Sequence, residues 1–142
     1  MKKIIFPLFF MATLLANAQD WHTDFEQAKR IAKEKNQNIV LVFEGSDWCA
    51  PCKKLNREIF NSKEFKTYSK EHFVLLKVDF PKKKKNKLTK IQQEKNYSLA
   101  EKYNHRGFFP LVVVLNKKGD VLGETGYTKS SPTEYIELLA AF

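Results

Sequence analysis

The stretch that decides the fold is EGSDWCAPCK at residues 44–53, which holds both cysteines of the chain with two residues between them. Directly before it, NIVLVF at 38–43 is a continuous apolar run, which is typical of a strand buried on both faces. Directly after it, PCKKLNREIF at 51–60 is typical of a helix, because proline is tolerated in a first helical turn. The pattern therefore predicts a strand that feeds a helix, with Cys49 at the junction.

Strand and helix patterns alternate along the rest of the chain. Short apolar runs predict strands, and apolar residues at helical spacing predict helices. Capping boxes are predicted at Thr23 with Glu26 and at Ser131 with Glu134. This alternation, closed by a hairpin, indicates an α/β sandwich with a central mixed sheet of about four to five strands flanked by helices. The predicted strands are residues 38–43, 73–80, 110–115 and 121–127, and the predicted helices are residues 23–35, 51–60, 62–72, the later part of 81–104, and 131–142.

The composition indicates one domain that folds without help from a disulfide. The chain has 142 residues, 43% of them hydrophobic and 12 of them Phe, which is enough for a proper core. Charged residues make up 29% and are spread along the chain, which argues against disorder. A disulfide across only two intervening residues would stabilise the fold little.

The first eighteen residues have the three parts of a secretory signal. MKK is basic, the apolar run at residues 4–15 follows, and ANA ends at Ala18 as a small-x-small cleavage site. We expect a signal peptide at 1–18, a domain at 19–142, and a periplasmic or secreted protein. An uncleaved anchor is the alternative, but the apolar run is shorter than the ~20 residues that a spanning helix needs.

Export bears on the cysteines, because thiols outside the cytosol are driven toward disulfides. The pair is then a permanent bond or a working redox couple, and its short spacing favours redox chemistry. Zinc sites use the same Cys-x-x-Cys spacing, so a metal site is the alternative. His22, His72 and His105 lie at no metal-ligand spacing from the cysteines, and we therefore expect no metal.

The motif has a clear resemblance once its neighbours are included. WCAPCK at a strand-to-helix junction, with GFFP at 107–110 before a later strand, resembles the thioredoxin fold and its thiol:disulfide oxidoreductases. More narrowly, FEGSDWCAPCKKL, the lysine-rich stretch after VDF, and LAEKYNHRGFFPLVVVLNKKGDVLGETGY are similar to secreted bacterial thioredoxin-like proteins. The similarity runs from about Thr23 to Phe142. It implies an exported enzyme that reduces or exchanges protein disulfides.

The two sulfurs are expected to have different roles. A helix start places backbone N–H groups and the positive end of the dipole at Cys49, so its thiol should titrate below the ~8.5 of a free cysteine. We expect Cys49 to be exposed and to attack the substrate, and Cys52 to be buried and to break the mixed disulfide. The Cys49–Cys52 disulfide is then the redox group, and no other cofactor is needed.

The resemblance also assigns a substrate surface, formed by Trp48, Pro51, Phe109 and Pro110. It implies a cis bond before Pro110, which leaves the backbone of Phe109 free to pair with an extended substrate segment. Trp48 would flank the cysteines, and a core aromatic is the alternative interpretation.

Two departures from the family pattern concern the site. Thioredoxins commonly place a buried acid six residues before the first cysteine, where this chain has Phe43. Glu44 is a candidate proton relay in its place, but alternate strand residues face opposite sides, so a loop or surface carboxylate is the alternative. GFFP also has one residue more between glycine and proline than the commonest family pattern.

Partners are predicted from chemistry and charge. We expect protein disulfides as substrates, a membrane thiol transporter as electron donor, and a monomer. The Ala-Pro pair between the cysteines favours a reductant. The lysine run at 82–85 is interpreted as a solvated loop, with an anionic-surface or nucleic-acid patch as the alternative. Since no aromatic residues interleave with the lysines, we expect no nucleic acid. The alternative function is a non-catalytic binding protein that holds a partner or a metal.

Overall fold

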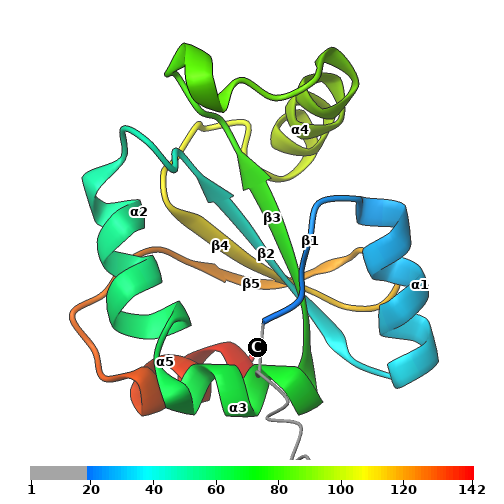
Figure 1. Cartoon of the computed structure of the whole chain (residues 1–142). Coiled ribbons are helices and arrows are strands. Elements are labelled where there is room, and N and C mark those ends of the chain that lie inside the picture. The colour runs from blue at the N-terminus through cyan, green and yellow to red at the C-terminus, as the bar shows by residue number, and fades with distance from the viewer. Residues whose placement is uncertain (1–18) are drawn as a thin grey trace, which may run out of the picture.

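The computed structural model describes residues 19–142, so the predicted signal peptide at 1–18 lies outside the described residues. Its centre is a five-stranded mixed sheet in the order β1-β3-β2-β4-β5 (Figure 1). β1, β3 and β2 are parallel, and β4 and β5 are antiparallel to their neighbours. The sheet confirms the predicted fold class. The strands are β1 (Trp21–His22), β2 (Asn38–Glu44), β3 (Phe73–Asp79), β4 (Leu111–Leu115) and β5 (Val121–Thr125).

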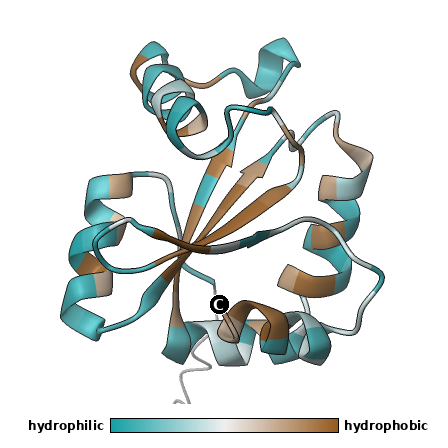
Figure 2. Cartoon of the chain, turned by 180° about the vertical axis from the view of Figure 1, so that it is seen from behind, coloured by the Kyte–Doolittle hydropathy of each residue, from teal (hydrophilic) through white to brown (hydrophobic). Residues whose placement is uncertain are grey.

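Helices cover both faces of the sheet, as Figure 1 shows. α1 and α4 pack on one face, and α2, α3 and α5 pack on the other. In Figure 2 the central strands are mainly hydrophobic, whereas the helices mix hydrophilic and hydrophobic residues. The helices are α1 (Phe25–Lys35), α2 (Ala50–Leu55), the π-helical η1 (Asn56–Phe60), α3 (Lys63–His72), the 3₁₀ turn η2 (Lys84–Asn86), α4 (Lys90–Tyr103) and α5 (Pro132–Ala140).

β2 contributes to the cores on both faces of the sheet, as its continuous apolar run predicts. Ile39, Leu41 and Phe43 lie in the core under α1 and α4. Val40 and Val42 lie in the core under α2, α3 and α5. Because side chains alternate along a strand, successive residues of β2 point into opposite cores. The strand is one residue longer than predicted and ends at Glu44, on the same face as Val40 and Val42.

The start of α1 differs from the prediction. Asp24, not Thr23, is the N-cap, and its Oδ1 accepts the N–H of Gln27 at 2.9 Å. A carboxylate is among the preferred caps because it accepts an unpaired N–H of the first turn. Glu26 pairs instead with Lys29 at 2.8 Å. The predicted capping box at Thr23 and Glu26 is therefore wrong by one residue.

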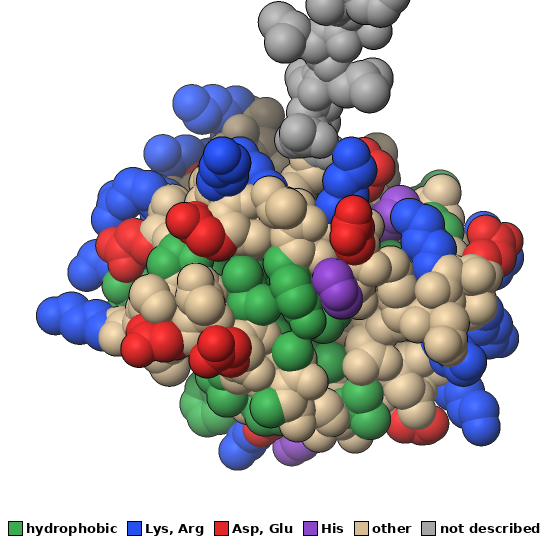
Figure 3. All heavy atoms as spheres, turned by 90° about the horizontal axis from the view of Figure 1, so that it is seen from below, with side chains coloured by type: hydrophobic (Ala, Val, Ile, Leu, Met, Phe, Trp, Pro, Cys, Tyr) green, Lys and Arg blue, Asp and Glu red, His purple; other side chains and the backbone are tan. Residues whose placement is uncertain are grey.

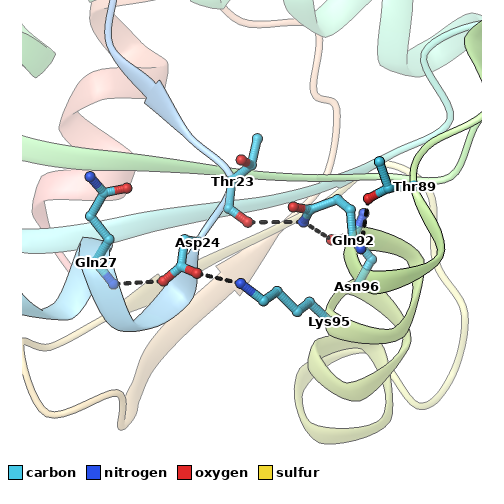
Figure 4. Close-up of polar contacts among 7 residues, drawn as sticks. All are labelled: Thr23, Asp24, Gln27, Thr89, Gln92, Lys95 and Asn96. Carbon is cyan, nitrogen blue, oxygen red and sulfur yellow. Dashed lines mark hydrogen bonds and ion pairs between the residues drawn. The ribbon is translucent and has the colours of Figure 1, made fainter.

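α4 is joined to the start of α1 by a group of polar contacts (Figure 4). Lys95 Nζ lies 2.7 Å from Asp24 Oδ2, and the side chain of Gln92 donates to the carbonyl of Thr23 at 3.0 Å and to Asn96 Oδ1 at 2.8 Å. The hydrogen bond from Lys95 is the main reason why the pKa of Asp24 is lowered. These contacts fix α4 beside the N-terminal end of the domain.

α5 begins at the capping box that the sequence predicts. Ser131 Oγ accepts the N–H of Glu134 at 3.2 Å, and Glu134 Oε2 accepts the N–H of Ser131 at 2.7 Å. The helix buries Tyr135 and Leu139 against the sheet, so its first turn anchors part of one core.

Replacing the cap in Ser131→Ala should lower the free energy of unfolding by about 1 kcal/mol, because an N–H of the first turn loses its acceptor. Urea denaturation followed by circular dichroism would measure the change. Ser130→Ala is the matched control, since Ser130 is outside the cap and contacts only Thr128 through its hydroxyl. Equal stability of the two variants would contradict the role of the cap.

Candidate active site

The two cysteines form a disulfide at the start of α2, with 5.3 Å between their Cα atoms. Cys49 is the N-cap residue, and its sulfur accepts the N–H of Cys52 at 3.3 Å. Pro51 lies in the first turn, as predicted. Cys52 is fully buried, but Cys49 is only 4% exposed. The expectation that Cys49 is exposed is therefore wrong for the disulfide form, because its sulfur is turned toward the helix and bonded to the buried Cys52.

The loop between β2 and α2 is fastened to the end of β3. The carboxylate of Asp79 accepts the N–H of Ser46 at 2.9 Å and its hydroxyl at 2.6 Å. The indole N–H of Trp48 donates to the carbonyl of Phe80 at 2.7 Å. These bonds join residues more than thirty positions apart in sequence, with separations of 33 and 32. They hold the loop that carries Cys49 in one place.

Trp48 lies at the surface beside the cysteines. It is 38% exposed, which contradicts its interpretation as a core aromatic. A Cβ added to Gly45 would come within 2.2 Å of the indole ring, so the ring packs directly on this glycine and a larger residue would displace it. On another edge, the ring contacts Phe109 with 5.4 Å between centroids. The structure therefore brings together two of the residues predicted to bind substrate.

The Phe109–Pro110 peptide bond is cis, which confirms the geometry that the resemblance implies. The loop before it is held by Asn104, which is only 5% exposed. Asn104 Oδ1 accepts the N–H of Phe108 at 2.9 Å, and its Nδ2 donates to the carbonyl of Phe108 at 2.8 Å. Gly107 has a φ of +69°, a conformation that favours glycine. Asn104 is not among the residues predicted for the site, although an asparagine at a helix end before Gly-Phe-Phe-Pro was an available signal.

Glu44 is a buried acid on the α2 side of the sheet. It is 2% exposed, its Oε2 accepts from Asn56 Nδ2 at 2.7 Å, and its Oε1 lies 3.3 Å from Lys77 Nζ. Asn56 follows Cys52 by one helical turn and donates its N–H to the Cys52 carbonyl. Phe43 points into the opposite core. The interpretation of Glu44 as a loop or surface carboxylate is therefore wrong.

The described residues 19–142 contain no group of three or more His, Cys, Asp and Glu side chains that could hold a metal ion. The histidines lie apart, and His72 stacks on Tyr68 with 3.9 Å between ring centroids. Within the same residues, no helix has the length and apolar character to cross a membrane.

The fold and the Cys-x-x-Cys pair define a thioredoxin-like protein. Residues 25–142 match the thioredoxin-like domain family, and the chain belongs to this family. The Cys49–Cys52 disulfide and the similarity of 85% of the chain to a known disulfide bond reductase make the protein a thiol:disulfide oxidoreductase.

Known relatives include proteins of disulfide chemistry. The disulfide bond reductase DsbH of Chlamydia pneumoniae is 34% identical over 121 residues, which cover 85% of this chain and 70% of DsbH. A solved structure of a DsbH oxidoreductase superimposes with a TM-score of 0.79 at 30% identity, covering 86% of this chain and 82% of that one. The oxidised C-terminal domain of Neisseria meningitidis DsbD shares the fold, with a TM-score of 0.58 at 19% identity over 82% of this chain and 90% of that one.

The position of Glu44 leads to a prediction about the second step of disulfide exchange. If Glu44 takes the proton of Cys52, Glu44→Gln should slow release of the mixed disulfide by about 10²-fold, the lower end of the effect of a general base. The attack by Cys49 should keep its rate, because that step does not need the Cys52 proton. Rapid-quench measurements of the two steps would test this, with the attack rate as internal control. Unchanged release would leave Glu44 without a catalytic role.

Proposed function

We propose that the protein is exported and reduces or exchanges disulfides of other proteins through Cys49 and Cys52. The observation that carries this proposal is the disulfide at the start of α2, in which the Cys49 sulfur already accepts the N–H of Cys52. In the reduced protein, the same N–H and the helix dipole would stabilise a thiolate on Cys49. A thiolate is the form of cysteine that attacks a disulfide.

The exchange takes two steps. The Cys49 thiolate attacks one sulfur of the substrate disulfide and becomes joined to it, while the other substrate sulfur leaves as a thiolate that takes up a proton. Cys52 then loses its proton, in our proposal to Glu44, and attacks the sulfur of Cys49. The protein disulfide forms, and the second substrate sulfur leaves as a thiolate that takes up a proton. Two electrons have passed from the cysteine pair to the substrate.

The substrate would lie across Trp48, Pro51, Phe109 and Pro110. The cis bond before Pro110 supports pairing of the Phe109 backbone with an extended segment of the substrate, because sheet-like hydrogen bonds hold a peptide without regard to its sequence. Trp48 contacts Phe109 and would form one wall of this surface. Pro51 lies next to the reacting sulfurs.

Reduction is the direction that we propose. The relative DsbH is named a disulfide bond reductase, and the Ala50-Pro51 pair resembles that of reducing family members. The protein would act in the periplasm or outside the cell after cleavage near Ala18, as a monomer, with its disulfide as the sole redox group. A membrane thiol transporter would return it to the reduced state, since an exported reductase is otherwise oxidised and stays so. Equilibration in glutathione buffers would measure the reduction potential of the Cys49–Cys52 pair. A potential near those of strong oxidants would indicate that the protein oxidises its substrates instead.

The cysteine variants test the mechanism most directly. Cys52→Ser, expressed in the periplasm, should accumulate covalent adducts that run high on non-reducing gels and vanish with dithiothreitol, because capture remains while release is lost. Cys49→Ser is the matched control and should accumulate few or none. Both variants must be shown to be folded.

Two results would count against the proposal. Equal absence of adducts from both variants would contradict the exchange mechanism. Failure of the wild-type protein to catalyse insulin reduction by dithiothreitol would indicate a non-catalytic binding protein that uses the same surface.

A further inference from the structure

A groove of about 700 Å³ extends from the active-site loop toward α4. Aromatic rings form a continuous row along it. Trp48 contacts Phe109, Phe109 contacts Phe80, and Phe80 contacts Tyr97, with centroid separations of 5.4, 5.6 and 5.5 Å. Tyr97 is 60% exposed, so the row ends at an exposed aromatic ring. The groove therefore begins at two residues of the proposed substrate surface and leads away from it.

Most of the charged side chains that line this groove are positive. Its lining includes four exposed lysines and one acid, Asp79, whose carboxylate already accepts two hydrogen bonds from Ser46. Within residues 19–142, none of the four lysines takes part in an ion pair with a carboxylate. The lysines are Lys82, Lys83, Lys84 and Lys87, and we call the site they line with the aromatic row the lysine groove.

The loop that carries these lysines, residues 81–87, is fastened to the active-site loop. The carboxylate of Asp47 accepts the backbone N–H groups of Lys82 and Lys83, both at 3.0 Å, and the side-chain amide of Asn86 at 2.9 Å. These bonds, that of Lys82 first, lower the pKa of Asp47 to about 2. Lys82 Nζ also lies 4.0 Å from the centroid of the Trp48 ring. The backbone of this loop is thus held beside the active-site loop, and the Lys82 side chain lies over Trp48, the residue before Cys49.

The groove differs in charge from the face at the other end of the sheet. Figure 3 views the opposite side, where acidic and basic side chains are intermixed around apolar surface. Four lysines and one acid, Asp79, line the groove, and the nearby carboxylate of Asp47 is bonded to the backbone of the lysine loop.

We propose that the lysine groove binds an acidic, extended segment of the partner protein that flanks its reacting disulfide. This inference rests on the proposed function. Lysines that form no ion pair within the protein attract the carboxylates of a bound segment, and the aromatic row can contact the apolar side chains of that segment. The groove is continuous with Phe109, whose backbone we propose pairs with the same segment. Charge of this kind acts chiefly on the rate of encounter, which a charged cleft can raise by about 10-fold or more.

The test uses the reduced protein, residues 19–142, and three synthetic peptides that contain the same disulfide loop. The residues that flank the loop are acidic in one peptide, neutral in the second and basic in the third. In each reaction Cys49 and Cys52 give up two electrons and two protons as they form their disulfide, and the peptide disulfide becomes two thiols. The second-order rate constant is measured by chromatography of quenched samples at low and high salt.

We expect the acidic peptide to react at least about 10-fold faster than the basic one at low salt, and the difference to shrink as salt screens the charges. Lys84→Glu/Lys87→Glu should slow the reaction of the acidic peptide and so remove this preference. Neither lysine binds Asp47, so the loop keeps its fastening. Lys33→Glu/Lys118→Glu is the control with the same change of charge. Lys33 precedes the start of β2 and Lys118 follows β4, whose end pairs with that start, so both lie far from the groove.

The outcomes separate the two proposals. If all three peptides react at one rate and the groove variant behaves as the control variant, the groove proposal is wrong and the oxidoreductase function stands. If no peptide is reduced at all, the proposed function itself fails. A further experiment measures co-sedimentation of the protein with phosphatidylglycerol vesicles. If the protein binds vesicles through Lys84 and Lys87 but shows no preference among the peptides, the proposal is wrong and the groove binds a membrane surface.

Discussion

The hydrogen bonds between the active-site loop and the end of β3 are the constraint on which the site depends. β2 must turn into α2 over the few residues from Gly45 to Cys49, and a short loop of this kind has few partners of its own. Asp79 and the carbonyl of Phe80 supply those partners from the neighbouring strand. The sheet register therefore positions Trp48 and, through it, the ring of Phe109.

The fold and the cysteine junction could be predicted because their signals are local. A continuous apolar run followed by Cys-Ala-Pro-Cys predicts a buried strand and a helix start, and the structure has both. β1 was missed because its two residues are too few to show a period. The position of Glu44 could not be read because it depends on where β2 ends, and a shift of one residue moves a side chain to the other face.

Contacts between segments that are distant in sequence could not be predicted either. The lysine run reads as a solvated loop in sequence, and its side chains are exposed, but its backbone binds Asp47 from 35 and 36 residues away. Asn104 likewise holds the loop before Pro110 through backbone atoms of Phe108, and the type of its partner residue gives no sign of this contact. A polar side chain that binds backbone groups can do so with almost any partner residue. Such a contact therefore leaves no recognisable pattern in the sequence.

The burial of Glu44 is difficult to explain by stability alone. Removing a carboxylate from water costs several kcal/mol, and replacing such an ion pair by apolar residues is often neutral or stabilising by about 1–4 kcal/mol. Val40 and Val42, on the same face of β2 as Glu44, show that this face accepts apolar side chains. Lys77 and Asn56 compensate part of the cost, and Lys77 stays 28% exposed. Glu44 is bonded to Asn56, which lies one helical turn after Cys52, and the proton-relay role that we propose for Glu44 would account for an acid that stability alone does not explain.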